Sequence, residues 1–234
     1  MVDPIKKRAK AHTRYYLDDG AEVPGVTTVL NLLGNNKDVL MNWAWKLGME
    51  GINYRTYRDE TAVVGTLAHY LAQCDLAGVE SDTSMYSPQQ INDAENALIK
   101  FYGWRKENIV VPIFTEKPLV SHKYGYGGTI DLYANLQQGD GEVRALVDYK
   151  TGSGVYLEHI CQTAAYENLL IENKYPVDDR RLLRIGRDET EGFEQHVLGR
   201  AELEPYFEIF VHMLGVYRAI QRINQAKKRG RRVA

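Results

Sequence analysis

Three strand-like segments follow one another closely in the middle of this chain, and they constrain its fold more than any other feature. They cover residues 109–115, 126–136 and 143–150, and the last two are separated by the Gly/Asp-rich turn QQGDGE. Such short β-favouring runs predict strands, and a turn of this kind predicts an antiparallel pair. We therefore expect an antiparallel meander at the centre of the protein.

Helix-like and further strand-like segments flank the meander. Apolar residues at helical spacing predict helices over about 62–77, 87–103, 156–172 and 205–226, and two further strands are predicted near 181–185 and 193–197. The first 60 residues, with a turn at Pro24 and Gly25, read as short helices. Neither an internal repeat nor a linker is visible, so we expect one domain over residues 1–234.

Two acids and a lysine lie on the second and third predicted strands. Because side chains alternate between the two faces of a strand, Asp148 and Lys150 point the same way. The apolar face of the preceding strand consists of Ile130, Leu132 and Ala134, which leaves Asp131 on the opposite face. If the apolar faces of both strands meet the same core, Asp131 and Asp148 lie near each other.

This pair of carboxylates suggests a metal site. Two carboxylates at close range repel each other unless a cation lies between them, and hard oxygen ligands favour Mg²⁺ or Mn²⁺. A neighbouring lysine can hold a water molecule and neutralise charge on a phosphate, as metal-assisted phosphodiester hydrolysis requires. A D-x-K triplet at a strand end more commonly forms a surface ion pair, so the strand pattern alone leaves both interpretations open.

Four short motifs favour the metal-site interpretation. They are GTLAH at 65–69, GGTIDLYA at 127–134, VDYKTG at 147–152 and QTAAY at 162–166. Together and in this order they resemble the signature of the RecB-like branch of the PD-(D/E)XK nuclease superfamily. The resemblance implies an α/β fold with a restriction-endonuclease-like core, in which helices flank a central mixed β-sheet, with helical additions at both ends of the chain.

The resemblance also implies roles for individual residues. The implied metal ligands are His69, Asp131, Asp148 and the backbone carbonyl of Tyr149. Lys150 would position the attacking water. The family also supplies the cofactor expectation, which is Mg²⁺ or Mn²⁺.

Three further residues are expected at the site. Gln162 and Tyr166 are four residues apart, so they share a helix face and would contact DNA near the scissile phosphate. Glu116, on or just after the first strand, resembles an acid found there in relatives. Each has a plainer alternative, which is a local backbone cap for Gln162, core packing for Tyr166 and an exposed strand-end charge for Glu116.

The same resemblance implies a divalent-metal-dependent deoxyribonuclease, preferably an exonuclease, acting in recombination, repair or phage DNA processing. DNA ends or single strands would be its substrate, and a recombinase or single-strand-binding protein is a candidate partner. A structure-specific endonuclease and a catalytically silent DNA-end-binding module remain as alternatives. A glycosidase with two catalytic carboxylates is disfavoured, because the lysine and the QTAAY helix have no role in that reaction.

Within the single domain we expect a helical N-terminal region over about 1–60, a catalytic core over about 61–200, and a closing helix with a basic tail over about 201–234. The net charge is -2, so any DNA affinity must come from local patches. The candidate phosphate contacts are Lys123, Arg180, Arg181, Arg184 and the tail from Lys227 to Arg232.

Cysteine content and hydropathy exclude several classes. Cys74 and Cys161 are the only cysteines, too few for a four-cysteine iron–sulfur cluster, and we expect both to be buried hydrophobic residues. The sequence contains no signal-peptide-like apolar core and no apolar run of the roughly 18 residues that a membrane span needs. We therefore expect no membrane association and a cytoplasmic location.

Overall fold

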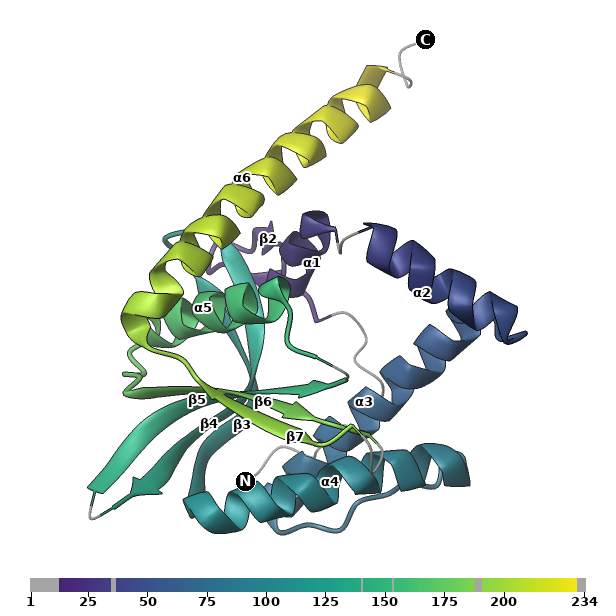
Figure 1. Ribbon diagram of the computed structural model, residues 1–234. Helices are drawn as coiled ribbons and strands as arrows, with labels where there is room; N and C mark the ends of the chain where they lie inside the picture. Colours follow the sequence, from purple (N-terminus) through teal and green to yellow (C-terminus); the bar gives the residue numbers. More distant parts are fainter. Residues whose placement is uncertain (1–12, 35–36, 140, 153, 188–190, 231–234) are drawn as a thin grey trace.

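The computed structural model describes residues 13–34, 37–139, 141–152, 154–187 and 191–230 (Figure 1). In chain order its elements are β1 (Tyr15–Tyr16), β2 (Glu22–Val23), α1 (Val26–Leu30), a 3-10 helix (Asn31–Leu33), α2 (Lys37–Met49), α3 (Tyr54–Ala77), α4 (Pro88–Asn108), β3 (Val110–Ser121), β4 (Tyr126–Gln138), β5 (Gly141–Thr151), α5 (Leu157–Glu172), β6 (Asp179–Ile185), β7 (Phe193–Val197) and α6 (Arg200–Gly230). Residues 231 and 232 of the predicted basic tail lie outside the described residues.

The five longer strands form one mixed sheet, in the order β3-β4-β5-β6-β7. β3 pairs antiparallel with β4, and β4 pairs antiparallel with β5, which confirms the predicted meander. β6 runs parallel to β5, and α5 supplies the crossover connection that a parallel neighbour requires. β7 completes the sheet antiparallel to β6. The predicted fold class, α/β with a mixed sheet flanked by helices, is confirmed.

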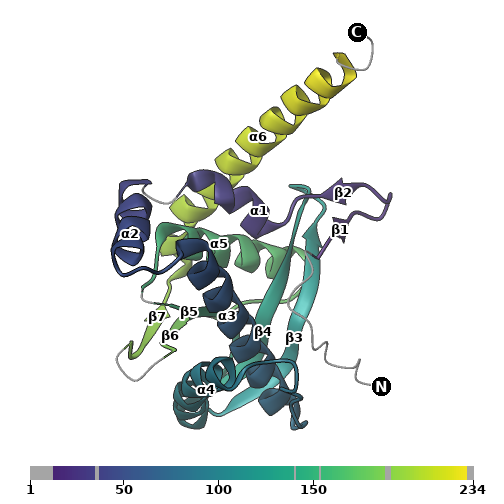
Figure 2. The same ribbon diagram turned by 90° about the vertical axis from the view of Figure 1, so that its right-hand side faces the viewer.

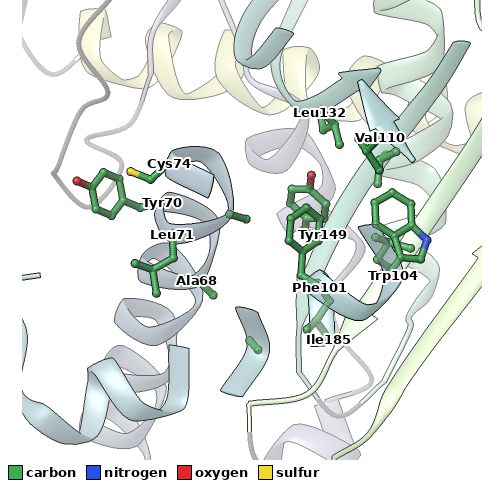
Figure 3. Packing of buried hydrophobic residues seen from close by; sticks show 14 of the residues in the cluster. Ala68, Tyr70, Leu71, Cys74, Phe101, Trp104, Val110, Leu132, Tyr149 and Ile185 are labelled. Carbon is green, nitrogen blue, oxygen red and sulfur yellow. The ribbon is translucent and has the colours of Figure 1, made fainter. Parts of the chain in front are cut away.

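Helices cover both faces of the sheet (Figures 1 and 2). α3 and α4 pack against one face, in a core that includes Leu132 and Val147. Figure 3 shows part of this core, with aromatic side chains of α4 beside the strands. α1, α5 and α6 pack against the opposite face, where Leu146 lies. Cys74 and Cys161 are buried in these two cores, as predicted.

The alternation of side chains on β4 differs from the prediction. Leu132 and Ala134 belong to the core beneath α3 and α4, but Ile130 packs in the opposite core with Leu146. The prediction that Ile130 shares a face with Leu132 is therefore wrong. Pairing with β5 ends at Leu132, so the preceding part of β4, which stays paired with β3, can follow the strand's own twist away from β5.

The N-terminal region also differs from the expected run of short helices. It contains α1 and α2, but a small antiparallel hairpin of β1 and β2 comes first. In Figure 2 this hairpin lies beside the ends of β3 and β4. α3 begins earlier than expected, at Tyr54, because the Asn53 side chain caps it by accepting a hydrogen bond from the Arg55 backbone N–H.

α6 leaves the body of the protein and ends at Gly230 (Figure 1). Its first turns pack in the cores with α5, whereas the side chains beyond Arg222 are exposed along its last turns. No helix within the described ranges combines the length and the apolar character needed to cross a membrane.

Candidate metal centre

Three potential metal ligands from three different elements converge beside the sheet. His69 of α3, Glu116 of β3 and Asp131 of β4 each offer one ligand atom, and these atoms lie within 4.8 Å of one another. Nδ1 of His69 is 3.6 Å from one oxygen of Glu116 and 3.6 Å from one oxygen of Asp131. That nitrogen is buried, and within the described residues it has no hydrogen-bond partner. Two carboxylates and an unsatisfied imidazole nitrogen are a suitable donor set for a divalent cation.

A close helix–strand contact brings His69 to this centre. A methyl group on Gly65 would lie only 2.7 Å from Oγ1 of Thr151, so α3 can approach the end of β5 this closely because residue 65 has no side chain. His69 follows four residues later, about one helical turn along α3. The glycine of the GTLAH motif therefore has a physical role in placing the histidine.

Glu116 stands opposite Asp131 in the ladder between β3 and β4. The flanking pairs are Thr115 with Leu132 and Lys117 with Ile130, which leaves Glu116 and Asp131 facing each other between them. Glu116 has a φ angle of 48°, in the left-handed region that non-glycine residues rarely adopt. Backbone strain of this kind persists where the surroundings enforce it, and it is frequent at functional sites.

Asp148 lies next to the three-residue group of His69, Glu116 and Asp131 but does not belong to it. Its side chain is 0% exposed, is ion-paired with Lys150, and accepts a hydrogen bond from Nε2 of Gln162 at 3.3 Å. Burial raises the pKa of Asp148 to about 6, the Lys150 ammonium opposes this rise, and the charge on Asp131 adds to it. The two acids are therefore close enough to interact, as their strand positions predicted.

Tyr149 supports the centre through both its backbone and its ring. Its backbone N–H donates to Oδ2 of Asp131 at 3.2 Å, and its carbonyl oxygen is 3.4 Å from Nζ of Lys150. The ring packs edge-on against His69 and Phe101, with ring centroids 5.5 and 5.3 Å apart, and Figure 3 shows Tyr149 beside Phe101. Burial raises the pKa of the Tyr149 hydroxyl well above its ordinary value. Tyr149 thus holds Asp131 and the His69 ring in place.

Gln162 and Tyr166 meet on the inner face of α5. The Gln162 amide donates to the Tyr166 hydroxyl at 2.9 Å as well as to Asp148. Burial raises the pKa of Tyr166 well above its ordinary value, so the hydroxyl stays neutral. Of the two predicted helix residues, Gln162 therefore contacts the buried acid directly, and Tyr166 is joined to it through Gln162.

A cavity of about 790 Å³ opens over these residues. Six residues predicted for the site line it, namely His69, Asp131, Tyr149, Lys150, Gln162 and Tyr166. Glu116 and Asp148 contact this set without lining the cavity. One cavity therefore brings together residues from four motifs that lie up to about a hundred residues apart in the sequence.

The opposite wall of the cavity comes from the N-terminal region, which sequence analysis did not predict. Tyr15 of β1 lines it, and its hydroxyl forms a 2.9 Å hydrogen bond with Oγ1 of Thr129. The backbone N–H of Gly127 donates to the Pro24 carbonyl at 2.9 Å. A Cβ on Gly127 would lie 2.2 Å from the Tyr15 ring, so only glycine admits this crossing. In the sequence, the signal for this contact was the glycine pair in GGTID. These glycines lie within β4 and not in a turn, so they are not needed to reverse the chain.

Three of the predicted phosphate contacts are wrong. Arg180, Arg181 and Arg184 lie on β6, are only 5–6% exposed, and form internal ion pairs. Their respective partners are Glu167, Asp179 and Glu194. β6 lies between β5 and β7 and is covered on both faces, which leaves these guanidinium groups no access to a ligand. Lys123 and the lysines near the end of α6 are exposed and remain candidates.

No family model matches the chain, and no curated protein matches it. Among solved structures it is similar to SSO0001, at 15% identity and a TM-score of 0.31, over 56% of this chain and 64% of that one. It is also similar to an alkaline exonuclease from Laribacter hongkongensis, LHK-Exo, at 15% identity and a TM-score of 0.38, over 74% of this chain and 92% of that one. The complex of LHK-Exo with dAMP gives 15% identity, a TM-score of 0.37 and coverages of 75% and 92%.

At these sequence identities and TM-scores, structural similarity does not establish the activity or the substrate of this chain. It also spans less than two thirds of the SSO0001 chain. The chemistry of the cavity residues is therefore the basis for a functional proposal.

Proposed function

We propose that this chain is a divalent-metal-dependent nuclease that hydrolyses DNA phosphodiester bonds, acting preferably from DNA ends. The observation that carries the proposal is the convergence of His69, Glu116 and Asp131 next to Asp148 and Lys150, at a cavity that His69, Asp131 and Lys150 line. A buried imidazole nitrogen beside two carboxylates favours a bound cation, because such a nitrogen is costly to bury without a hydrogen-bond partner, and within the described residues this one has none. The RecB-like motif pattern of the sequence agrees with the same chemistry.

The proposed cation is Mg²⁺ or Mn²⁺, held by His69, Glu116 and Asp131, with Asp148 and the Tyr149 carbonyl as further candidates from the family pattern. Carboxylate oxygens favour these hard ions over softer metals, and one imidazole is compatible with Mn²⁺. When bound, the cation supplies a Lewis acid that withdraws charge from a phosphate oxygen.

The residues around the cation site have distinct proposed roles. Lys150 lies between Asp148 and the cavity, where its ammonium holds a water molecule for attack and neutralises charge that develops on the phosphate. Gln162 keeps the Asp148 carboxylate oriented, because the Tyr166 hydroxyl fixes the same amide. Loss of Gln162 would release Asp148 while leaving the three-residue group intact.

The cavity is closed on one side, and this shape supports the proposed preference for DNA ends. Tyr15 and the β1–β2 hairpin close one side, tied to β4 by the Tyr15 to Thr129 and Gly127 to Pro24 hydrogen bonds. A strand end enters such a cavity more readily than the middle of a duplex. The competing proposals are a structure-specific endonuclease and a silent DNA-end-binding module.

Cleavage of end-labelled linear and covalently closed circular DNA, each with Mg²⁺ or Mn²⁺, tests the proposal. We expect degradation of linear DNA, intact circles, and no cleavage by Lys150→Ala. Lys106→Ala is a matched control, since Lys106 is exposed near the end of α4 and outside the cavity, and it should cleave as the wild type does.

Cutting of closed circles would favour the endonuclease. Equal inactivity of wild type and Lys150→Ala with every substrate and metal would contradict the nuclease proposal and favour the binding module.

A further inference from the structure

A histidine outside the predicted site, His159, lies on the first turn of α5 and lines the same cavity. It precedes Gln162 by three residues, so the two side chains share one face of the helix. Lys150, also a lining residue, is close enough for its charge to act on the His159 ring. His159 is therefore part of the cavity wall beside the proposed catalytic lysine.

The position of the ring proton follows from a hydrogen bond with the backbone. The Tyr156 N–H donates to Nδ1 of His159 at 3.2 Å, so Nδ1 acts as an acceptor and carries no proton. In the neutral ring the proton is then on Nε2. No residue in the described part of the chain accepts a hydrogen bond from Nε2. The Nε2–H is thus a donor available to something in the cavity.

The ring is also neutral under ordinary conditions. Burial and the neighbouring Lys150 ammonium hold the pKa of His159 at about 4. A neutral donor adds a hydrogen bond without placing a second positive charge against Lys150. Phosphate oxygens accept hydrogen bonds and donate none, so a phosphodiester suits this combination.

We infer that His159 is a substrate-binding residue whose Nε2–H donates to a phosphate oxygen of the DNA strand beside Lys150. This inference rests on the proposed nuclease function and adds a contact that the four motifs do not contain. The competing interpretation is purely structural: Nδ1 accepts the Tyr156 N–H at the start of α5, and the ring has no further task.

The substitutions His159→Asn and His159→Gln separate these interpretations. Each variant keeps a side-chain oxygen that can accept a hydrogen bond from the Tyr156 N–H, but the two side chains differ in how far they reach. In His159→Asn the amide oxygen replaces Nδ1, but the short side chain has no donor that reaches the position of Nε2. In His159→Gln the longer amide reaches further into the cavity. A glutamine at the matching position of α4, Gln90, already accepts the backbone N–H of Ser87, so this residue type serves as a cap in this protein.

The assay is the affinity for a fluorescein-labelled oligodeoxythymidylate, measured by anisotropy in Ca²⁺, with cleavage in Mg²⁺ and thermal unfolding followed in parallel. We expect His159→Asn to weaken binding roughly tenfold, as loss of a hydrogen bond to a charged group does, with an unchanged melting temperature. His159→Gln should recover most of that affinity.

Equal affinity of His159→Asn and wild type, or an equal loss in both variants, would overturn the inference. So would losses that simply follow the melting temperature, because a structural cap alone predicts that result. If wild type cleaves DNA and only the His159 expectations fail, the nuclease proposal stands. If wild type neither binds nor cleaves DNA, both proposals fail.

Discussion

Asp148 is predicted to destabilise the metal-free protein, and its replacement by asparagine should reveal the penalty. The carboxyl is fully buried, and burial raises its pKa to about 6 from the ordinary 3.8, although Lys150 is beside it. The fold therefore prefers the protonated, neutral form of this side chain. A buried carboxylate that is costly without a cation is what a metal site requires.

The sign and size of the penalty follow from this difference in pKa. Because the pKa is higher in the folded than in the unfolded chain, the favourable contribution is complete below 3.8 and is lost as the pH rises through about 6. At about 1.4 kcal/mol for each pKa unit, the ionised Asp148 lowers the free energy of unfolding by up to about 3 kcal/mol. Asparagine has the same shape and does not ionise.

In EDTA at about pH 8, Asp148→Asn should therefore unfold at higher urea concentration than wild type, with a gain of about 1–3 kcal/mol. The expected gain can be smaller than the full ionisation penalty, because Asp148→Asn also removes the negative charge that pairs with Lys150. The gain should disappear near pH 4, where the wild-type carboxyl is protonated. Cleavage should be abolished, while DNA binding should persist because a negative charge near phosphate is removed.

Asp178→Asn is a matched control with the opposite sign. Hydrogen bonds from Arg144 lower the pKa of Asp178, so its carboxylate stabilises the fold above the ordinary pKa of 3.8, and asparagine should be destabilising at about pH 8. If Asp148→Asn were no more stable than wild type at about pH 8, the reasoning about its buried charge would be refuted.

Two further substitutions test the packing around the site. Arg180→Ala should lower the free energy of unfolding by about 3–5 kcal/mol, because Glu167 is left as a buried, unpaired charge, and the affinity of the folded protein for DNA should not change. Weaker DNA binding with normal stability would instead make Arg180 a phosphate contact. Gly65→Ala should reduce cleavage by displacing His69, since its Cβ would lie 2.7 Å from Oγ1 of Thr151, and a second change, Thr151→Ala, should restore activity. Full activity of the single variant would contradict this account.

The antiparallel meander of β3, β4 and β5 could be predicted from the sequence because its pattern is local. Alternating side chains and a Gly/Asp turn between β4 and β5 define an antiparallel pair, and the observed register joins Leu132 to Val147 and Leu136 to Val143. That register explains why Asp131 and Asp148 lie near each other. Burial raises the pKa of Asp148, and the nearby charge on Asp131 adds to that rise.

Other features of the site depend on tertiary contacts and leave no periodic signal. Glu116 reaches His69 through a left-handed backbone conformation that its sequence neighbours do not indicate. Tyr15 enters the cavity wall only because Gly127, more than a hundred residues later, has no side chain to exclude it. His159 belongs to none of the four motifs, and its inferred role depends on the neighbours that the fold provides.

For the basic residues of β6, the sequence predicted a functional contact that the structure does not contain. Arg180, Arg181 and Arg184 look like a phosphate-binding cluster in the sequence, because charge is normally exposed. β6 lies between β5 and β7 with helices on both faces, so these side chains are buried and find partners within the protein. Burial of a charged strand could not be predicted without knowing the order of the strands.

The most direct test of the proposed metal centre is anomalous diffraction from crystals soaked in MnCl₂. We expect a peak within bonding distance of His69, Glu116 and Asp131, and loss of that peak in Glu116→Gln crystals soaked in the same way. An occupied manganese site elsewhere on the protein, with no peak between these three side chains, would contradict it.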